Sequence, residues 1–140
     1  MRQPDCIFCR IVEGTLPSTR IYEDALSLAF MDIGPIVKGH VLVIPKDHYD
    51  PLTALPLPLL QHLIGVVQKV ARAQVKALGA DGFNISQANG AAAGQIVPHV
   101  HFHVIPRFNT DGHHWNWIPK EYADRQEMKG FADRIGTALE

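Results

Sequence analysis

Three histidines in one short segment have the spacing best suited to chemistry. His99, His101 and His103 alternate with apolar residues over positions 99–105. In a β-strand, alternate side chains point to one face, so the three imidazoles would share a face, about 6.5–7 Å apart in succession. Near neutral pH an imidazole can act as nucleophile, acid, base or metal ligand. The segment therefore predicts a reaction centre on a rigid strand, and the same spacing suits a zinc site built from imidazoles.

A loop of small residues precedes the histidines. Positions 90–95 read Gly-Ala-Ala-Ala-Gly-Gln. Small side chains let a ligand approach the backbone, and exposed N–H groups in such a loop can hold phosphate oxygens. A tight surface connection is the alternative interpretation. Beside three histidines, we favour a phosphate site.

The two cysteines form the pair Cys6-x-x-Cys9. This spacing is common in half of a tetrahedral zinc site. The pair alone is weak evidence, because two packed or free thiols would have the same sequence.

The strands expected to position these residues cluster along the sequence and do not alternate regularly with helices. A long amphipathic helix is expected at 57–79 and a second at 120–138. Because the strands cluster, we expect an α+β fold with an antiparallel sheet. The expected strands are residues 21–23, 26–31, 40–45, 82–88 and 99–106.

Length and charge limit the classes of protein. A chain of 140 residues with 46% hydrophobic content fits one domain. A net charge of −1 argues against a general binder of nucleic acid or membrane surfaces. The first five residues lack a signal-peptide pattern, so a cytoplasmic location is expected, with both cysteines reduced or metal-bound.

Residues 99–105 match the His-φ-His-φ-His-φ-φ signature of the histidine triad (HIT) family, where φ is apolar. The pair Gly94-Gln95 precedes it as in that family. The resemblance covers residues 5–107, and within the family the chain is similar to the Hint-like bacterial branch. It implies a HIT-like fold with about five antiparallel strands in one domain, 1–140, whose loop and helix at 108–140 follow the motifs. Further matching segments are residues 6–14, 32–35, 39–46 and 105–107.

The resemblance implies a chemistry. Family members cleave nucleoside phosphates at the α-phosphorus through a nucleotidyl-histidine, and the attacking residue corresponds to His101. His103 and backbone N–H groups around Gly94 and Gln95 would stabilise the phosphate charge. His99 completes the catalytic set.

The resemblance also implies substrate contacts. Asp32 would hold the ribose hydroxyls and Ile33 would lie beside a purine base, with Asn89 near the leaving group. Ile96 stands where relatives carry serine or threonine, and Ala88 where they often carry an amide. Further residues of the apolar base pocket would be Phe8, Ile11 and Ile21, for which simple core packing is an equally good interpretation.

His103 favours the hydrolase branches, because the related uridylyltransferases carry glutamine at that position. The Hint-like branch implies AMP-phosphoramidate or similar small substrates, and dinucleoside polyphosphate hydrolysis is the near alternative. Two further classes stay open: a zinc metallohydrolase using the three histidines, and a nucleotide-binding protein without catalysis.

For the metal, the resemblance implies that His48 and His99 complete a structural zinc site with Cys6 and Cys9. A zinc-bound His99 could not donate a proton to a leaving group. No organic cofactor is expected.

The resemblance also implies a homodimer that uses the helix at 57–79. Val66 and Val75 widen the apolar stripe of this helix, which favours a second contact surface. The alternative is a monomer in which residues 120–138 cover that surface. The segment 113–117 is interpreted either as a loop that shapes substrate choice or as an ordinary loop, and His40 and His62 as structural or surface residues.

Overall fold

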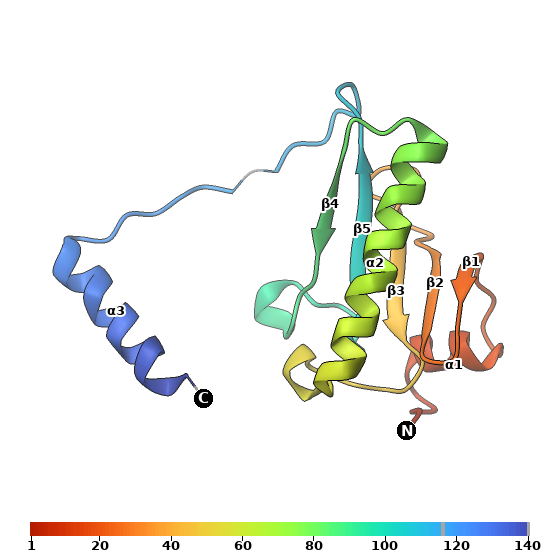
Figure 1. Cartoon of the computed structure of the whole chain (residues 1–140), viewed down its shortest axis with the longest axis horizontal. Coiled ribbons are helices and arrows are strands. Elements are labelled where there is room, and N and C mark those ends of the chain that lie inside the picture. The colour runs from red at the N-terminus through yellow and green to blue at the C-terminus, as the bar shows by residue number, and fades with distance from the viewer. Residues whose placement is uncertain (116, 140) are drawn as a thin grey trace.

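A five-stranded antiparallel sheet forms the centre of the computed structural model, which describes residues 1–115 and 117–139 (Figure 1). Its spatial order is β1-β2-β3-β5-β4. The predicted α+β class with an antiparallel sheet is confirmed. The strands are β1 Arg20–Glu23, β2 Ser27–Met31, β3 Val41–Pro45, β4 Gly82–Ser86 and β5 Phe102–Arg107.

The helix α2, Leu57–Leu78, crosses one face of the sheet and matches the long helix predicted from sequence. Pro56 begins the helix, and Gly79 ends it with a φ of 65°, a left-handed conformation that glycine adopts at little cost. The helix α1, Ile7–Glu13, lies on the other side. Two short 3₁₀ turns, η1 Leu52–Ala54 and η2 Ala91–Ala93, connect the larger elements.

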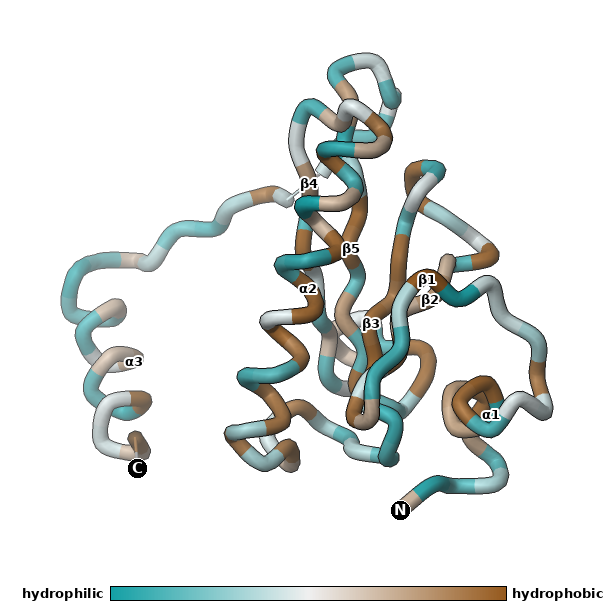
Figure 2. The backbone as a smooth tube through the Cα atoms, turned by 45° about the vertical axis from the view of Figure 1, so that its right-hand side comes forward, coloured by the Kyte–Doolittle hydropathy of each residue, from teal (hydrophilic) through white to brown (hydrophobic). Residues whose placement is uncertain are grey.

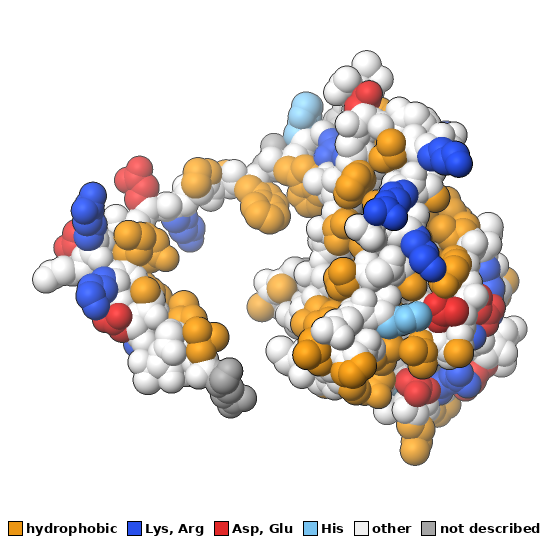
Figure 3. All heavy atoms as spheres, viewed as in Figure 1, with side chains coloured by type: hydrophobic (Ala, Val, Ile, Leu, Met, Phe, Trp, Pro, Cys, Tyr) orange, Lys and Arg blue, Asp and Glu red, His pale blue; other side chains and the backbone are white. Residues whose placement is uncertain are grey.

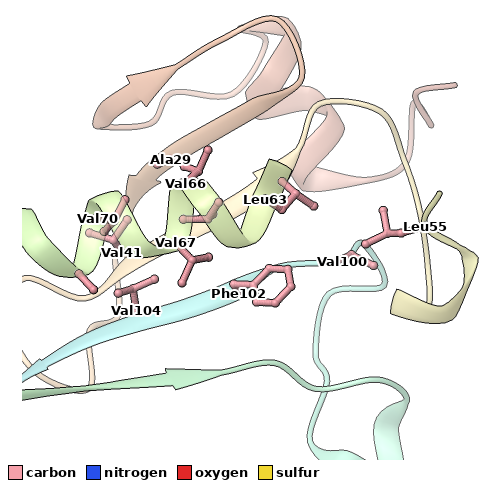
Figure 4. Packing of buried hydrophobic residues seen from close by; sticks show 12 residues of the cluster. Ala29, Val41, Leu55, Leu63, Val66, Val67, Val70, Val100, Phe102 and Val104 are labelled. Carbon is pink, nitrogen blue, oxygen red and sulfur yellow. The ribbon is translucent and has the colours of Figure 1, made fainter. Parts of the chain in front are cut away.

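The main core lies between α2 and the sheet (Figure 4). The apolar residues between the histidines belong to this core, as the alternation predicted. The histidines therefore face the opposite side, where α1 packs over a second cluster. The central side chains of the main core are Leu63, Val67, Val70, Val100, Phe102 and Val104.

The last strand starts later than expected. β5 begins at Phe102, and His99 and His101 lie in an irregular segment before it. The His99 amide donates to the Val97 carbonyl at 2.9 Å, which bends the chain, and the Val100 amide donates to the Tyr49 carbonyl at 2.8 Å. The evenly spaced row of imidazoles predicted for a strand is therefore replaced by a bend.

The C-terminal helix α3, Arg125–Ala138, stands away from the sheet at the end of an extended segment (Figures 1 and 2). It starts five residues after the predicted 120 because Asp124 caps it, accepting from the Glu127 amide at 2.8 Å. None of its described residues is buried, and its hydrophobic side chains are exposed (Figure 3). The alternative in which this helix covers α2 is therefore wrong. The prediction for the segment 113–117 lies partly outside the described residues, at position 116.

No helix among the described residues combines the length and the apolar character needed to cross a bilayer.

Candidate active site

A cavity of about 520 Å³ opens on the histidine side of the sheet. Its volume lies in the range of small-molecule sites. His101, His103, Asp32 and Gly94 line it, together with apolar side chains from α1 and β2. One polar end beside an apolar wall suits a ligand with a phosphate and a flat base.

His101 is held in one tautomer. Its Nδ1–H donates to the His99 carbonyl at 2.7 Å, since a carbonyl can only accept. The proton on Nδ1 leaves a lone pair on Nε2. The ring is 6% exposed and packs edge-on against Phe8, with centroids 5.1 Å apart. The hydrogen bond and the packing against Phe8 therefore fix the orientation of the imidazole at the cavity, and positioning of this kind is what nucleophilic chemistry requires.

His103 lies next to His101, with ring centroids 5.0 Å apart. Its Nδ1 lies 2.9 Å from Nε2 of His40. Burial is the main cause that lowers the pKa of His103 to about 4, and the neighbouring His101 and His40 lower it further. At pH 7 the His103 ring is neutral.

A titration by NMR checks this pKa. Burial penalises the charged form, so protonation that occurs near pH 6.5 in a free imidazole is delayed until about pH 4. We expect the His103 ring signals to stay constant from pH 8 to about pH 5 and then to shift. A midpoint near 6.5 would contradict the burial of this ring.

His40 is buried, with 1% of its surface exposed, which agrees with the structural half of the prediction for this residue. Sequence reasoning did not predict its contact with His103. The signal was available in part: His40 directly precedes β3, and β3 pairs with β5 through Leu42 and His103. His62 fits its prediction, since it pairs with Asp24 at 2.8 Å outside the cavity.

His99 does not line the cavity. It is fully buried, and its Nε2–H donates to the Pro45 carbonyl at 2.9 Å. Its Nδ1 faces the thiols of Cys6 and Cys9, at 3.4 and 3.6 Å. Its expected membership of the catalytic set is therefore corrected: what it gives His101 is its backbone carbonyl.

Four side chains converge as the predicted metal site. The ligand atoms of Cys6, Cys9, His48 and His99 all lie within 4.8 Å of one another. Three sulfur–nitrogen separations in this group are 3.4, 3.5 and 3.6 Å. Tetrahedral zinc with Zn–S bonds of about 2.3 Å and Zn–N bonds of about 2.0 Å separates a sulfur ligand from a nitrogen ligand by about 3.5 Å. The three sulfur–nitrogen separations agree with this geometry, so this set of donors fits zinc.

The surroundings of these ligands also suit a metal. The Pro45 carbonyl fixes the proton of His99 on Nε2, which leaves Nδ1 free to ligate. The Gln3 amide donates to Cys9 Sγ at 3.3 Å, a bond that favours a thiolate. Burial raises the pKa of the Cys9 thiol, so metal binding has to displace its proton.

The alternative of zinc on the three triad histidines has no support among the described residues. His99 groups with the cysteines, whereas His103 groups with Asp32 and His40.

The loop amides expected to hold phosphate are already used. The Gly94 amide donates to the Ala91 carbonyl at 3.0 Å, and the Gln95 amide to the Gly90 carbonyl at 3.2 Å. That expectation is therefore wrong for these two N–H groups. The Gln95 side chain is structural too, since it accepts from the Gly90 amide and donates to Asp50 at 2.8 Å.

The next two amides of the loop are better placed. Ile96 and Val97 line the cavity, and their N–H groups donate no hydrogen bond within the described residues. No feature of the sequence predicts this shift, because it depends on the turn of the backbone at η2.

Other predicted contacts divide between the cavity and its surroundings. Phe8, Ile11, Asp32 and Ile33 line it. Ile21 does not, because it lies half-exposed on β1.

Two more residues singled out in the sequence form hydrogen bonds outside the cavity. Asn89 does not line the cavity; its side-chain oxygen accepts from the Leu52 amide at 2.8 Å and holds η1. Trp115 donates to Asn84 at 2.7 Å, which ties the start of the C-terminal segment to β4.

Comparisons with known proteins agree with this site. The HIT domain model matches residues 13–110. Adenosine 5'-monophosphoramidase of Schizosaccharomyces pombe is 41% identical over 135 residues, covering 96% of this chain and 98% of the relative. The crystal structure of SMU.412c from Streptococcus mutans is 40% identical with a TM-score of 0.91, covering 99% of this chain and 87% of that one. A Zn-bound histidine triad family protein from Mycobacterium smegmatis is 39% identical with a TM-score of 0.76, covering 96% and 98%. This chain belongs to the histidine triad (HIT) family.

Proposed function

We propose that this protein hydrolyses adenosine 5'-phosphoramidate and similar nucleotides at the α-phosphorus through a covalent nucleotidyl-His101. The observation that carries the proposal is the hydrogen bond from His101 Nδ1–H to the His99 carbonyl, which in the neutral ring places the lone pair on Nε2. The name of the fission-yeast relative, an adenosine 5'-monophosphoramidase, supports this class of substrate.

In the first step, His101 Nε2 attacks the α-phosphorus. The new N–P bond forms as the P–N bond to the leaving group breaks, and the leaving nitrogen departs as ammonia or an amine after it takes up a proton from solvent. In the second step, water attacks the same phosphorus and gives up a proton to solvent, the N–P bond to His101 breaks, and AMP is released. His103 and the amides of Ile96 and Val97 would donate to the phosphate oxygens in both steps.

The cavity also offers groups that suit the base and the ribose of a nucleotide. Phe8 and Ile11 form the apolar wall against which a purine would stack, and Ile33 stands at the rim. Asp32 Oδ1 accepts from the Gly34 amide at 2.8 Å, which holds the carboxylate ready for ribose hydroxyls.

The direct test compares two substrates at equal concentration, adenosine 5'-phosphoramidate and diadenosine polyphosphate. We expect the larger kcat/KM for the phosphoramidate. Faster turnover of the dinucleotide would move the assignment to the dinucleoside polyphosphate hydrolases. Binding of AMP without turnover of either substrate would make the protein a nucleotide-binding member of the family.

The bound metal in this proposal is structural zinc. Four protein ligands leave no open position for a substrate, so the metal would tie α1 and the segment at His48 to the bend at His99. The Zn-bound relative from Mycobacterium smegmatis supports this assignment.

The proposal includes a homodimer formed through α2 and β4. β4 is an edge strand with unpaired backbone groups, and an apolar groove lies between it and α2. Val75, Phe83 and Ile85 in this groove are 40%, 46% and 47% exposed. Val66 is buried in the core and does not widen the stripe, contrary to the prediction.

Sedimentation equilibrium at micromolar concentration tests the dimer. We expect a mass twice the 15.5 kDa of one chain, and a shift to the mass of one chain in Ile85→Lys, because the charge would be buried in the interface. Leu26→Lys, an equally exposed apolar residue in the β1–β2 turn, is the matched control and should stay dimeric. A wild-type mass of 15.5 kDa would refute the dimer.

A further inference from the structure

Besides the predicted zinc site, a second cluster of possible metal ligands lies at the cavity, where Asp32 and His103 line it. One atom each of Asp32, His40 and His103 falls within 4.8 Å of the others. Two interpretations compete: a metal site, or a chain of hydrogen bonds that ends at His103.

The Ile36 amide decides between them. Its N–H donates to His40 Nδ1 at 3.2 Å, so this nitrogen offers a lone pair and the single proton of a neutral His40 is on Nε2. A metal bound through Nε2 would push that proton onto Nδ1, directly against the Ile36 N–H. The surrounding loop is fixed, since the His40 amide donates to the Val37 carbonyl and the His40 carbonyl accepts from the Asp32 amide, both at 3.0 Å. The cluster is therefore a hydrogen-bond chain.

The direction of the chain follows from the same proton. His40 Nε2–H lies 2.9 Å from His103 Nδ1, whereas the nearest Asp32 carboxylate oxygen is 3.6 Å away, beyond a hydrogen bond. The proton therefore points at His103, whose Nδ1 accepts it. The ring proton of a neutral His103 is then on Nε2.

We propose that His40 is a positioning residue that selects the tautomer of His103, so that His103 presents Nε2–H to the phosphate. Together with His101, this gives two adjacent rings of opposite tautomer. The His99 carbonyl keeps a lone pair on His101 Nε2, and the Ile36–His40 pair keeps a proton on His103 Nε2. The first nitrogen can attack phosphorus while the second donates to the developing charge. The catalytic part of this inference rests on the proposed function.

Burial makes the selection necessary. It lowers the pKa of both His40 and His103, so neither ring gains a second proton near pH 7. In the other tautomer, His103 would turn a lone pair toward the negatively charged phosphate oxygens. A neutral His103 therefore depends on its partner for its donor.

The experiment compares His40→Leu with His40→Gln, using His62→Gln as the control outside the cavity. Two-dimensional ¹H–¹⁵N NMR of the ring nitrogens reads the tautomer without substrate. We expect His103 to be protonated on Nε2 in the wild type and in His62→Gln. His40→Leu should give a mixed or reversed tautomer, and His40→Gln, whose amide can donate to Nδ1, should restore Nε2–H.

Kinetics add a second measurement. Losing one well-placed donor to a transition-state oxyanion costs about 10²-fold in kcat. We expect His40→Leu to lose about that much with KM changed little, and His40→Gln to recover most of it. Protonation of His103 on Nδ1 in the wild type would overturn the inference. So would an unchanged tautomer and kcat in His40→Leu.

The two proposals fail separately. The tautomer of His103 is measured in the free protein, so the inference about His40 is tested even if no nucleotide is turned over. If His40→Leu does not fold, the wild-type spectrum and His40→Gln still decide the result.

Discussion

Replacing His101 with asparagine will lower kcat for adenosine 5'-phosphoramidate by about 10⁴-fold or more, because the covalent route is lost. The asparagine amide can still donate to the His99 carbonyl, as His101 Nδ1–H does at 2.7 Å. It has no nitrogen lone pair with which to attack phosphorus. The substitution therefore removes the nucleophile and keeps most of the local packing.

The binding measurements separate loss of chemistry from loss of structure. Calorimetry should give a Kd for AMP within a few-fold of wild type, and the Tm should change little. His62→Asn, a histidine hydrogen-bonded outside the cavity, should keep the wild-type kcat. Turnover of His101→Asn at the wild-type rate would end the proposed mechanism.

Loss of the metal ligands is the second large effect. Wild-type protein should contain about one zinc per chain by elemental analysis, because one four-ligand site is present among the described residues. Cys6→Ser with Cys9→Ser should lose the zinc and about 3 kcal/mol of unfolding free energy, which lowers Tm by about 10 °C. The reason is that α1 would no longer be tied to His48 and His99.

A chelator provides the internal control. EDTA should lower the Tm of the wild type toward that of the double serine variant and leave the variant unchanged. The kcat of the variant should fall less than that of His101→Asn, since its His101 keeps its lone pair. Carefully prepared wild-type protein without any metal would contradict the zinc assignment.

Regular periodicity carried most of the fold prediction. The apolar repeat of α2 and the alternation around His101 each report one element and the face that it buries, and both are read along a continuous stretch of chain. The clustering of strands, with one long helix, indicated the antiparallel sheet. Element ends were less accurate, because β5 and α3 start where particular hydrogen bonds at His99 and Asp124 allow.

What the sequence concealed depends on contacts between distant segments. His40 lies against His103 only because β3 pairs with β5 in the sheet. The amides of Gly94 and Gln95 are not available to phosphate because they donate to the carbonyls of Ala91 and Gly90. The burial of Val66 depends on its angular position around the axis of α2, because a small rotation moves a side chain from the surface into the core.

The central claim is the covalent bond to His101, and rapid-quench mass spectrometry of the intact protein tests it most directly. Protein mixed with adenosine 5'-phosphoramidate and quenched within one turnover should gain the mass of one adenylyl group. Peptide mapping in neutral or basic solution, where the N–P bond survives, should place that group on His101, and His101→Asn should gain nothing. Full turnover with no adenylylated protein at any quench time, or a label on another residue, would contradict the account.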